Sequence, residues 1–383
     1  MRQEPFLLPC SATQRRFARN PGQERHFLGS ARVRTAQARR FVISVAIVLG
    51  VASAATFTQG RRTSLDIYFI DVEGGQATLF VPPSGASMLV DAGWSGVNGR
   101  DADRIAAAAK QAGLSRIDYL VVTHYHRDHV GGVPDLAARI PVGTFVDHGP
   151  TVEQGAAPDA LFSAYVAARG KGRHLQVKPG DTIPVADLDV RVVSAAGDLA
   201  KAPLAGAGAP NPLCSAFKAK DEDPTENARS VGMVLSFGRF RMLDLGDLTW
   251  NKEHALVCPN NLLGAIDLYL TTHHGLDQSG ADVLVHAIQP RVAVMNNGAT
   301  KGGIPSAWQI VRSAPGLQDI WQVHQAVNAD ASHNAAEAFV ANLDEATAFG
   351  IKVSAERDGS FVVTNARNGN SKRYGPRSSG VAR

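Results

Sequence analysis

Short blocks of apolar residues begin near residue 65 and predict strands. Three of them, LDIYFIDV (65–72), ATLFVP (77–82) and SMLVDAG (87–93), are joined by Gly-Gly and Pro-Ser-Gly stretches, which predicts an antiparallel meander. The next block, DADRIAAAAKQAGL (101–114), has helical periodicity with Asp101 as its cap. It is followed by IDYLVVTH (117–124), a continuous apolar run that predicts a buried strand.

Strand and helix patterns continue to alternate toward the C-terminus. Helices are predicted from residue 134 and over 158–170, strands over 142–149, 188–195, 230–238, 240–247, 266–275 and 291–298, and a hairpin over 351–365 with an Asp-Gly turn. Residues 195–227 are rich in Gly, Pro, Ala and charge and predict a long surface excursion. Two blocks of strands with helices between and after them predict a four-layer α/β/β/α sandwich, an α/β fold, within residues 61–383.

The first 60 residues follow a different pattern. Arg39 and Arg40 precede an apolar run and then the small residues 52–55. This order is typical of an export signal, so we expect a basic leader over 1–60, an export signal near 39–55 and a periplasmic or secreted protein. An uncleaved anchor and a buried helix are the alternatives, although the apolar run is shorter than the roughly 20 residues of a spanning helix. Membrane contact is expected only through this leader, if it stays uncleaved.

The leader also carries the basic charge of the chain. The whole sequence has a net charge of +4, but residues 1–55 hold nine Lys and Arg and only two acids. The remainder has 30 basic and 33 acidic residues, a net charge of −3. The composition therefore gives no general signature of nucleic-acid binding.

Two cysteines, Cys214 and Cys258, lie outside the leader. An exported protein meets an oxidising compartment, where a disulfide between them is one expectation and two buried free thiols the other. Neither has the C-x-x-C spacing of a structural zinc site.

The stretch THYHRDHVGG (123–132) holds the candidate chemistry. His124 and His126 are two residues apart, so an extended segment directs them to the same side, and Asp128 and His129 follow at a bend. Imidazole and carboxylate groups are ligands for zinc-like divalent metals. A solvated polar loop is the alternative, and the other segments of the chain decide between them.

The H-x-H-x-D-H pattern resembles the signature of the metallo-β-lactamase superfamily of hydrolases. The resemblance covers roughly residues 65–365 and implies a metal-dependent hydrolase with one or two Zn²⁺ ions, with Mn²⁺ or Fe²⁺ as alternatives. Asp91 in MLVDAG matches the aspartate that orients the ligands, and Asp247 in RMLDLGDL matches the aspartate between two metals. The segment TTHHG supplies the closing histidine. The implied metal ligands are His124, His126, Asp128, His129, Asp247 and a closing histidine.

Two histidine positions stay open. His148 comes earlier in the chain than the usual third ligand of the first metal, so it is a metal ligand, a substrate-binding residue of the pocket or a structural histidine. His273 and His274 are adjacent, and neighbours on a strand point to opposite faces, so we expect one ligand. We favour His273 as the ligand and His274, with Asp128, as a catalytic proton-transfer group.

Within the superfamily the chain resembles the hydrolase domain of the ComEC competence proteins. The resemblance lies in YFIDVEGGQATLFV, NARSVGMVLSFGRFRMLDLGD and TTHHG, and departs from that group at Glu73 and Leu276. It implies that Asn227 and Ser230 contact the substrate, an Asx-turn being the alternative for Asn227. We expect an exported hydrolase of phosphoester or other small-molecule substrates. A lactone, lactam or thioester hydrolase and a non-catalytic metal-binding module are the alternatives.

Overall fold

The computed structural model describes residues 62–377, and the predicted leader over 1–60 lies outside them. The described residues form two nine-stranded sheets. The first sheet has the order β18 (Ser371–Tyr374), β17 (Phe361–Asn365), β16 (Ile351–Ala355), β1 (Leu65–Phe69), β2 (Thr78–Val81), β3 (Met88–Val90), β4 (Ile117–Val121), β5 (Val142–Asp147) and β6 (Arg173–Gln176). The second has the order β15 (Val340–Asn342), β14 (Asp319–His324), β13 (Val292–Met295), β12 (Leu268–Leu270), β11 (Phe240–Asp244), β10 (Gly232–Phe237), β8 (Asp189–Ala195) and β7 (Thr182–Ile183), with β9 (Asp198–Leu199) paired to β8.

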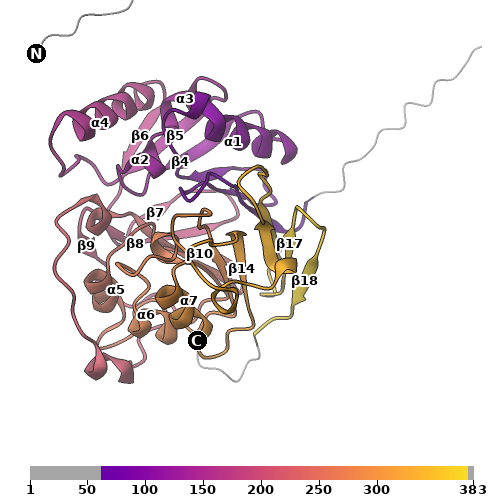
Figure 1. Ribbon diagram of the computed structural model, residues 1–383. Helices are drawn as coiled ribbons and strands as arrows, with labels where there is room; N and C mark the ends of the chain where they lie inside the picture. Colours follow the sequence, from indigo (N-terminus) through magenta and orange to yellow (C-terminus); the bar gives the residue numbers. More distant parts are fainter. Residues whose placement is uncertain (1–61, 378–383) are drawn as a thin grey trace, which may run out of the picture. The chain divides into compact units, whose positions relative to one another are not determined.

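The two sheets are stacked between two groups of helices (Figure 1), and three apolar cores lie between these four layers. The helices are α1 (Arg100–Gln111), α2 (Arg127–Val130), α3 (Val133–Ala137), α4 (Ala156–Arg169), α5 (Trp250–Val257), α6 (Asp282–Ile288) and α7 (Pro305–Arg312). One core lies between the two sheets, one joins the first sheet to α1, α3 and α4, and one joins the second sheet to α5, α6 and α7. The predicted four-layer sandwich is confirmed.

The alternation of side chains along the strands explains how one sheet serves two cores. In β2, Phe80 belongs to the core between the sheets, whereas Leu79 and Val81 on either side of it belong to the core against the helices. Successive side chains of a strand point to opposite faces. The predicted meander is confirmed, since β1 pairs antiparallel with β2 and β2 with β3. The strand β6, which is largely exposed at the sheet edge, carries no such pattern and was not predicted.

The excursion over residues 195–227 packs against the second sheet. It contains β9 and a short 3-10 turn, η2 (Pro212–Ala216), but no longer element. Cys214 of this turn forms a disulfide with Cys258, which follows α5 directly. Of the two expectations for the cysteines, the disulfide is confirmed.

The strand order brings the carboxyl ends of four strands to one edge of the sandwich. In the first sheet β3 and β4 run parallel, and Asp91 and His124 lie just beyond their ends. In the second sheet β11 and β12 run parallel, and Asp247 and His273 follow them. Ligands of α/β proteins bind at the carboxyl ends of such strands. The four segments singled out in the sequence therefore meet in one place.

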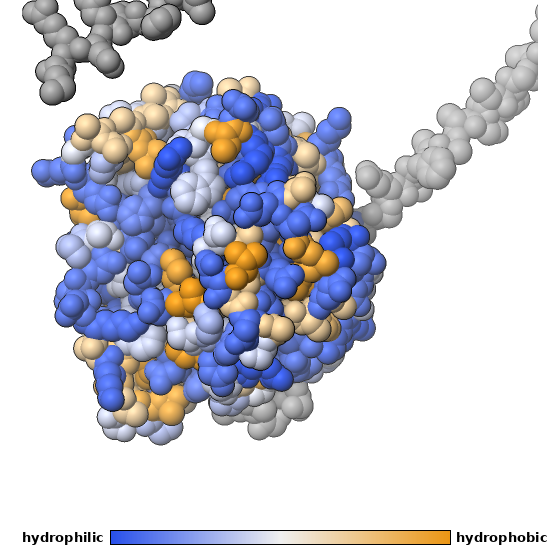
Figure 2. Space-filling model, viewed as in Figure 1, coloured by the Kyte–Doolittle hydropathy of each residue, from blue (hydrophilic) through white to orange (hydrophobic). Residues whose placement is uncertain are grey.

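On the face in Figure 2, apolar residues form small groups among hydrophilic ones. Over residues 62–377, no helix has the length and apolar character needed to cross a membrane.

Candidate metal centre

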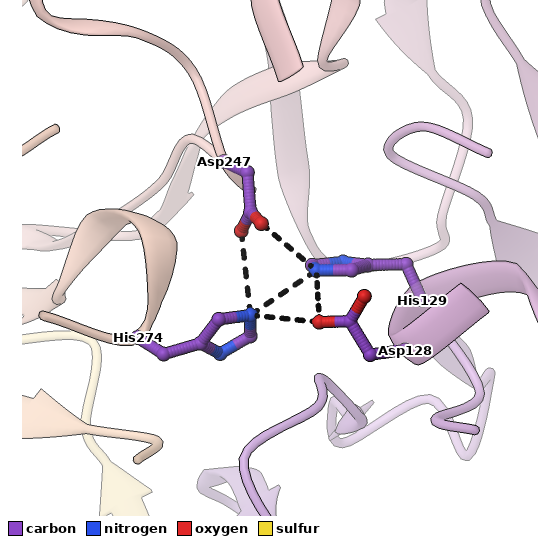
Figure 3. A group of neighbouring side chains, drawn as sticks. All are labelled: Asp128, His129, Asp247 and His274. Carbon is purple, nitrogen blue, oxygen red and sulfur yellow. Dashed lines mark hydrogen bonds and ion pairs between the residues drawn. The ribbon is translucent and has the colours of Figure 1, made fainter. Parts of the chain in front are cut away.

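Four buried side chains form the centre of the site, as Figure 3 shows. Asp128, His129, Asp247 and His274 each offer one ligand atom, and these atoms all lie within 4.8 Å of one another. The His129 Nε2 atom lies 3.2 Å from Asp247 Oδ2 and 3.3 Å from Asp128 Oδ2. The His274 Nε2 atom lies 3.2 Å from His129 Nε2 and 3.3 Å from Asp128 Oδ2. Two imidazoles and two carboxylates thus converge on one point.

Asp91 orients the first of these imidazoles. Its Oδ2 atom lies 2.7 Å from His129 Nδ1 and accepts a hydrogen bond of 2.7 Å from the Thr123 hydroxyl. The Thr123 amide donates to Oδ1 at 2.8 Å. Because Nδ1 is engaged, Nε2 is the atom of His129 left for a metal, and such carboxylate partners fix ring orientation in metal sites.

The first two histidines of the motif lie beside this cluster. His124 is fully buried, and its Nε2 atom is 3.8 Å from Asp247 Oδ2. The Nε2 atom of His126 lies 2.9 Å from Glu153 Oε1. Pairing with Glu153 leaves Nδ1 of His126 as the nitrogen that can bind a metal.

The closing pair departs from the geometry expected of a strand end. His273 and His274 lie in the 3-10 turn η4 (Thr272–Gly275) with φ values of 55° and 57°, both in the left-handed region. Side chains of such a turn do not alternate across a sheet, so the expectation that only one ring faces the site does not apply. The Nε2 atom of His273 lies 3.3 Å from Asp247 Oδ2, and that of His274 lies 3.5 Å from Asp247 Oδ1.

Asp247 therefore stands between two groups of histidines. Its Oδ2 atom faces His124 and His273 as well as His129, and its Oδ1 atom faces His274. The Nδ1 atom of His273 lies 3.3 Å from the buried Ser279 hydroxyl, a partner that orients the ring as Asp91 orients His129.

Burial and neighbouring charges set the ionisation of these groups. Burial lowers the pKa of His124 well below its ordinary value, and His129 beside it acts in the same direction. Burial also opposes the charge on His129, but the carboxylates of Asp247, Asp128 and Asp91 outweigh it and hold the pKa of His129 well above its ordinary value. His124 is thus neutral, the form that binds metals, and a metal at His129 takes the place of a proton.

The residues present fit a divalent metal. Among the described side chains, His124 Nε2 and Asp247 Oδ1 are buried polar atoms without a hydrogen-bond partner. An unsatisfied buried polar atom costs about 1–3 kcal/mol, so each marks a place for a ligand. Histidine nitrogen and carboxylate oxygen are also the donors that zinc-like ions prefer.

The three residues predicted to bind substrate lie in different surroundings. His148 Nε2 is 2.9 Å from Glu226 Oε2, and both side chains are buried. Asn227 lies in the turn η3 (Glu226–Arg229), and its Oδ1 atom is buried without a partner, so its side chain forms no Asx-turn. Ser230 Oγ accepts a hydrogen bond from the Asp247 amide at 3.2 Å. His148 thus pairs with Glu226, whereas Ser230 contacts Asp247 at the centre of the site.

Sequence reasoning missed three side chains that contact the site. Glu153 and Lys301 reach His126 and Asp128 from distant loops, and Glu226 pairs with His148. Each is a lone charged residue outside any motif, so no spacing could have identified it. A second group, Asp71, Glu73 and His324, also offers ligand atoms, but Arg104 already forms ion pairs with its two carboxylates.

Comparison with known proteins agrees with this geometry. Residues 70–208 match the family model of the metallo-beta-lactamase superfamily. Hydroxyacylglutathione hydrolase of Stenotrophomonas maltophilia is 43% identical over 63 residues, which are 16% of this chain and 21% of that protein. The chain thus matches about a fifth of the length of this curated relative.

The solved structures that match the chain are more distant in sequence. The metallo-beta-lactamase fold protein YhfI from Bacillus subtilis is 12% identical with a TM-score of 0.42, over 68% of this chain and 96% of that one. CmlA, a diiron beta-hydroxylase from Streptomyces venezuelae, is 17% identical with a TM-score of 0.35, over 61% of this chain and 44% of that one. Likeness at this level carries no argument about activity.

The family match includes the H-x-H-x-D-H segment, which supplies Asp128 and His129 to the buried His/Asp cluster and places His124 and His126 beside it. The two sheets and their outer helices form the sandwich on which such clusters are built. The match, the architecture and the cluster together show that the chain has the fold of the metallo-β-lactamase superfamily, with a buried group of metal-ligand side chains at the edge of the sandwich.

Proposed function

We propose that the protein is a zinc-dependent hydrolase of phosphoester bonds that acts outside the cytoplasm. The observation that carries the proposal is the position of Asp247, whose two carboxylate oxygens face different histidines. A carboxylate in this position suits two neighbouring metals, an arrangement that phosphatases and nucleases use to stabilise both the attacking and the leaving oxygen. Mn²⁺ and Fe²⁺ are the alternatives to zinc.

The ligands divide into two sets around Asp247. His124, His126 and His273 hold the first position, and His273 takes the place of the third histidine that the sequence lacks at the usual point. Asp128, His129 and His274 hold the second. This assignment makes His274 a ligand, where the sequence suggested a proton-transfer group. A bound metal would supply Lewis acidity and would lower the pKa of bound water to about 7.

The protein groups around the metals position the substrate and move the proton. Asp128 would accept the proton of the attacking water through the carboxylate oxygen other than Oδ2, because Oδ2 faces His129 and His274 and the side chain is buried away from bulk solvent. Asn227, with an unsatisfied Oδ1 atom, and Ser230 would contact the substrate. His148, which is buried against Glu226, stays a predicted substrate-binding residue. The resemblance to the ComEC hydrolase domain supports phosphoesters as the substrate class.

One observation favours a second candidate function. The 63-residue match to hydroxyacylglutathione hydrolase supports a hydrolase of thioesters on the same scaffold. Lactones and lactams need the same attack on a carbonyl carbon, and a metal-binding module without catalysis remains the alternative from another class.

An assay of four substrates tests the proposal. Bound metal is measured first, and the protein is then given an activated nitrophenyl phosphodiester, a lactone, a chromogenic β-lactam and a glutathione thioester. We expect the phosphodiester to be hydrolysed, and His126→Ala to reduce the rate to background. His333→Ala serves as the matched control, since His333 lies in an exposed 3-10 turn and pairs with Asp330.

The outcomes separate the candidates. Turnover of the thioester or lactone with no turnover of the phosphodiester would replace the proposed substrate class. Metal binding without turnover of any of the four would favour the binding module.

Export is a separate part of the proposal. The order of charged, apolar and small residues near 39–55 supports a cleaved signal, and the Cys214–Cys258 disulfide fits an oxidising compartment. We expect the full chain, expressed in a bacterium with a periplasm, to appear there with a new N-terminus after Ala55. A cytoplasmic protein with an intact leader would contradict export.

A further inference from the structure

Lys301 brings a positive charge to the edge of the metal cluster. It lies in the loop between β13 and α7, and its ammonium group contacts Asp128 Oδ2. The same oxygen faces the Nε2 atoms of His129 and His274, each at 3.3 Å. The Trp94 ring centre lies 4.9 Å from the ammonium, a cation–π distance.

The loop that carries Lys301 is held in place on both sides. The Gly298 amide donates to the Lys301 carbonyl at 2.9 Å, and the Gly303 amide donates to the His274 carbonyl at 2.9 Å. Gly302 has a φ of 75°, and a Cβ atom there would lie 2.1 Å from the His274 carbonyl oxygen. The backbone of Lys301 is therefore fixed beside the metal ligands, while its side chain has four rotatable bonds.

The Oδ2 atom of Asp128 cannot be in close contact with an ammonium group and with a divalent metal at the same time. A metal that binds this oxygen together with His129 and His274 repels the ammonium at contact distance. The lysine stem is flexible, and the Trp94 ring holds the charge near the site. An anionic oxygen of a molecule bound at the metals would then offer the ammonium a new partner.

We propose that Lys301 is a substrate-binding residue that recognises a charged phosphoryl oxygen next to the metal pair. The inference rests on the proposed phosphoesterase function and names the group that recognises its charge.

Other cations near the site are already held elsewhere. Arg104 forms ion pairs with Asp71 and Glu73, and Arg127 donates hydrogen bonds to Ser95. The Lys301 loop also begins with Asn296, which is 7% exposed and whose amide nitrogen and oxygen find no hydrogen-bond partner among the described residues. A buried amide left unsatisfied is costly, so the loop offers a neutral polar group as well as a charge.

Phosphate binding to the zinc-loaded protein tests the inference without relying on turnover. Inorganic phosphate is titrated calorimetrically into the wild type, Lys301→Gln and Lys301→Arg, and bound metal is measured in each. Lys110→Gln is the matched control, because Lys110 is an exposed lysine in the last turn of α1. We expect Lys301→Gln to weaken phosphate binding about 10- to 100-fold at unchanged metal content, since a hydrogen bond between charged groups is lost. Lys301→Arg should retain most of the affinity.

The results distinguish this inference from the proposed function. Equal phosphate affinity in Lys301→Gln and the wild type, no phosphate binding by the wild type, or loss of metal from Lys301→Gln would each overturn the role of Lys301. Weaker phosphate binding in Lys301→Gln, together with no phosphodiester hydrolysis by the wild type, would uphold Lys301 as an anion-binding residue and reject the proposed substrate class.

Discussion

Glu253 makes the stability of the protein depend on pH in a calculable way. This residue of α5 is fully buried, and its Oε2 atom accepts a hydrogen bond of 2.8 Å from the Ala281 amide. The Oε1 atom has no hydrogen-bond partner among the described residues. Burial raises the pKa of Glu253 from 4.5 to about 7, against the smaller opposing effect of the Ala281 amide.

The direction of the effect follows from proton binding. Between pH 4.5 and about 7 the unfolded chain has released the proton that the folded protein still holds, so the free energy of unfolding falls as pH rises through this window. Each pKa unit corresponds to about 1.4 kcal/mol, which gives a total of about 3 kcal/mol, of which about 2 kcal/mol falls between pH 5 and pH 8. Glu253→Gln removes the ionisation and keeps an acceptor for the Ala281 amide.

We therefore expect Glu253→Gln to gain about 2 kcal/mol of stability relative to the wild type between pH 5 and pH 8. Urea denaturation followed by circular dichroism at both pH values measures the free energy of unfolding of each protein. The contributions of metal binding and of other ionisable groups are the same in both proteins and cancel in the difference between them. Glu345→Gln, at an exposed loop position, is the control and should follow the wild type. A difference between Glu253→Gln and the wild type that does not change with pH would refute the reasoning.

Three further results are expected. Asp91→Ala should weaken metal affinity about 10- to 100-fold, as a chelator competition would measure, because His129 loses the partner of Nδ1; unchanged affinity would contradict the orienting role. The double variant Cys214→Ser, Cys258→Ser should have a free energy of unfolding about 4 kcal/mol lower in guanidinium denaturation, because the disulfide joins residues with a separation of 44. A decrease no larger than the experimental error would mean that the disulfide does not restrain the unfolded chain. Removing the metal with a chelator should lower the unfolding free energy by about 3 kcal/mol relative to protein in metal at 100 times its dissociation constant, and zinc should restore it; an unchanged melting temperature would argue against a metal site.

Most of the fold could be predicted because its cores follow local patterns. The strand β13 (Val292–Met295) is a continuous apolar run and is buried throughout, and the strand 351–355 alternates between buried and partly exposed residues. The strand 173–176 could not be found in this way, since it pairs at an edge and exposes most of its side chains. Pairing at an edge depends on its neighbour β5 rather than on its own sequence.

The candidate site was predictable where its residues belong to a motif and not where they stand alone. His124, His126, Asp128 and His129 are contiguous, and Asp91 and Asp247 follow strands in recognisable settings. These residues do lie together, and their roles in metal binding stay predictions. Lys301 and Glu153 reach the site through tertiary folding, from positions 173 residues after Asp128 and 27 residues after His126. No local pattern records such contacts.

The turn at His273 and His274 shows why strand periodicity fails at this site. Each non-glycine residue in the left-handed region costs about 1–3 kcal/mol, and such strain persists only where the surroundings impose it. Here the His273 amide donates to the Gly246 carbonyl at 3.0 Å, and the Gly303 amide donates to the His274 carbonyl at 2.9 Å. Loops from two different strands therefore hold the turn, and both rings approach Asp247. The chain lacks a histidine at the usual position of the third ligand of the first metal. The adjacent residues His273 and His274 instead bring two imidazoles to the site. They can do so because the backbone of their turn is strained, a conformation that strand periodicity does not predict.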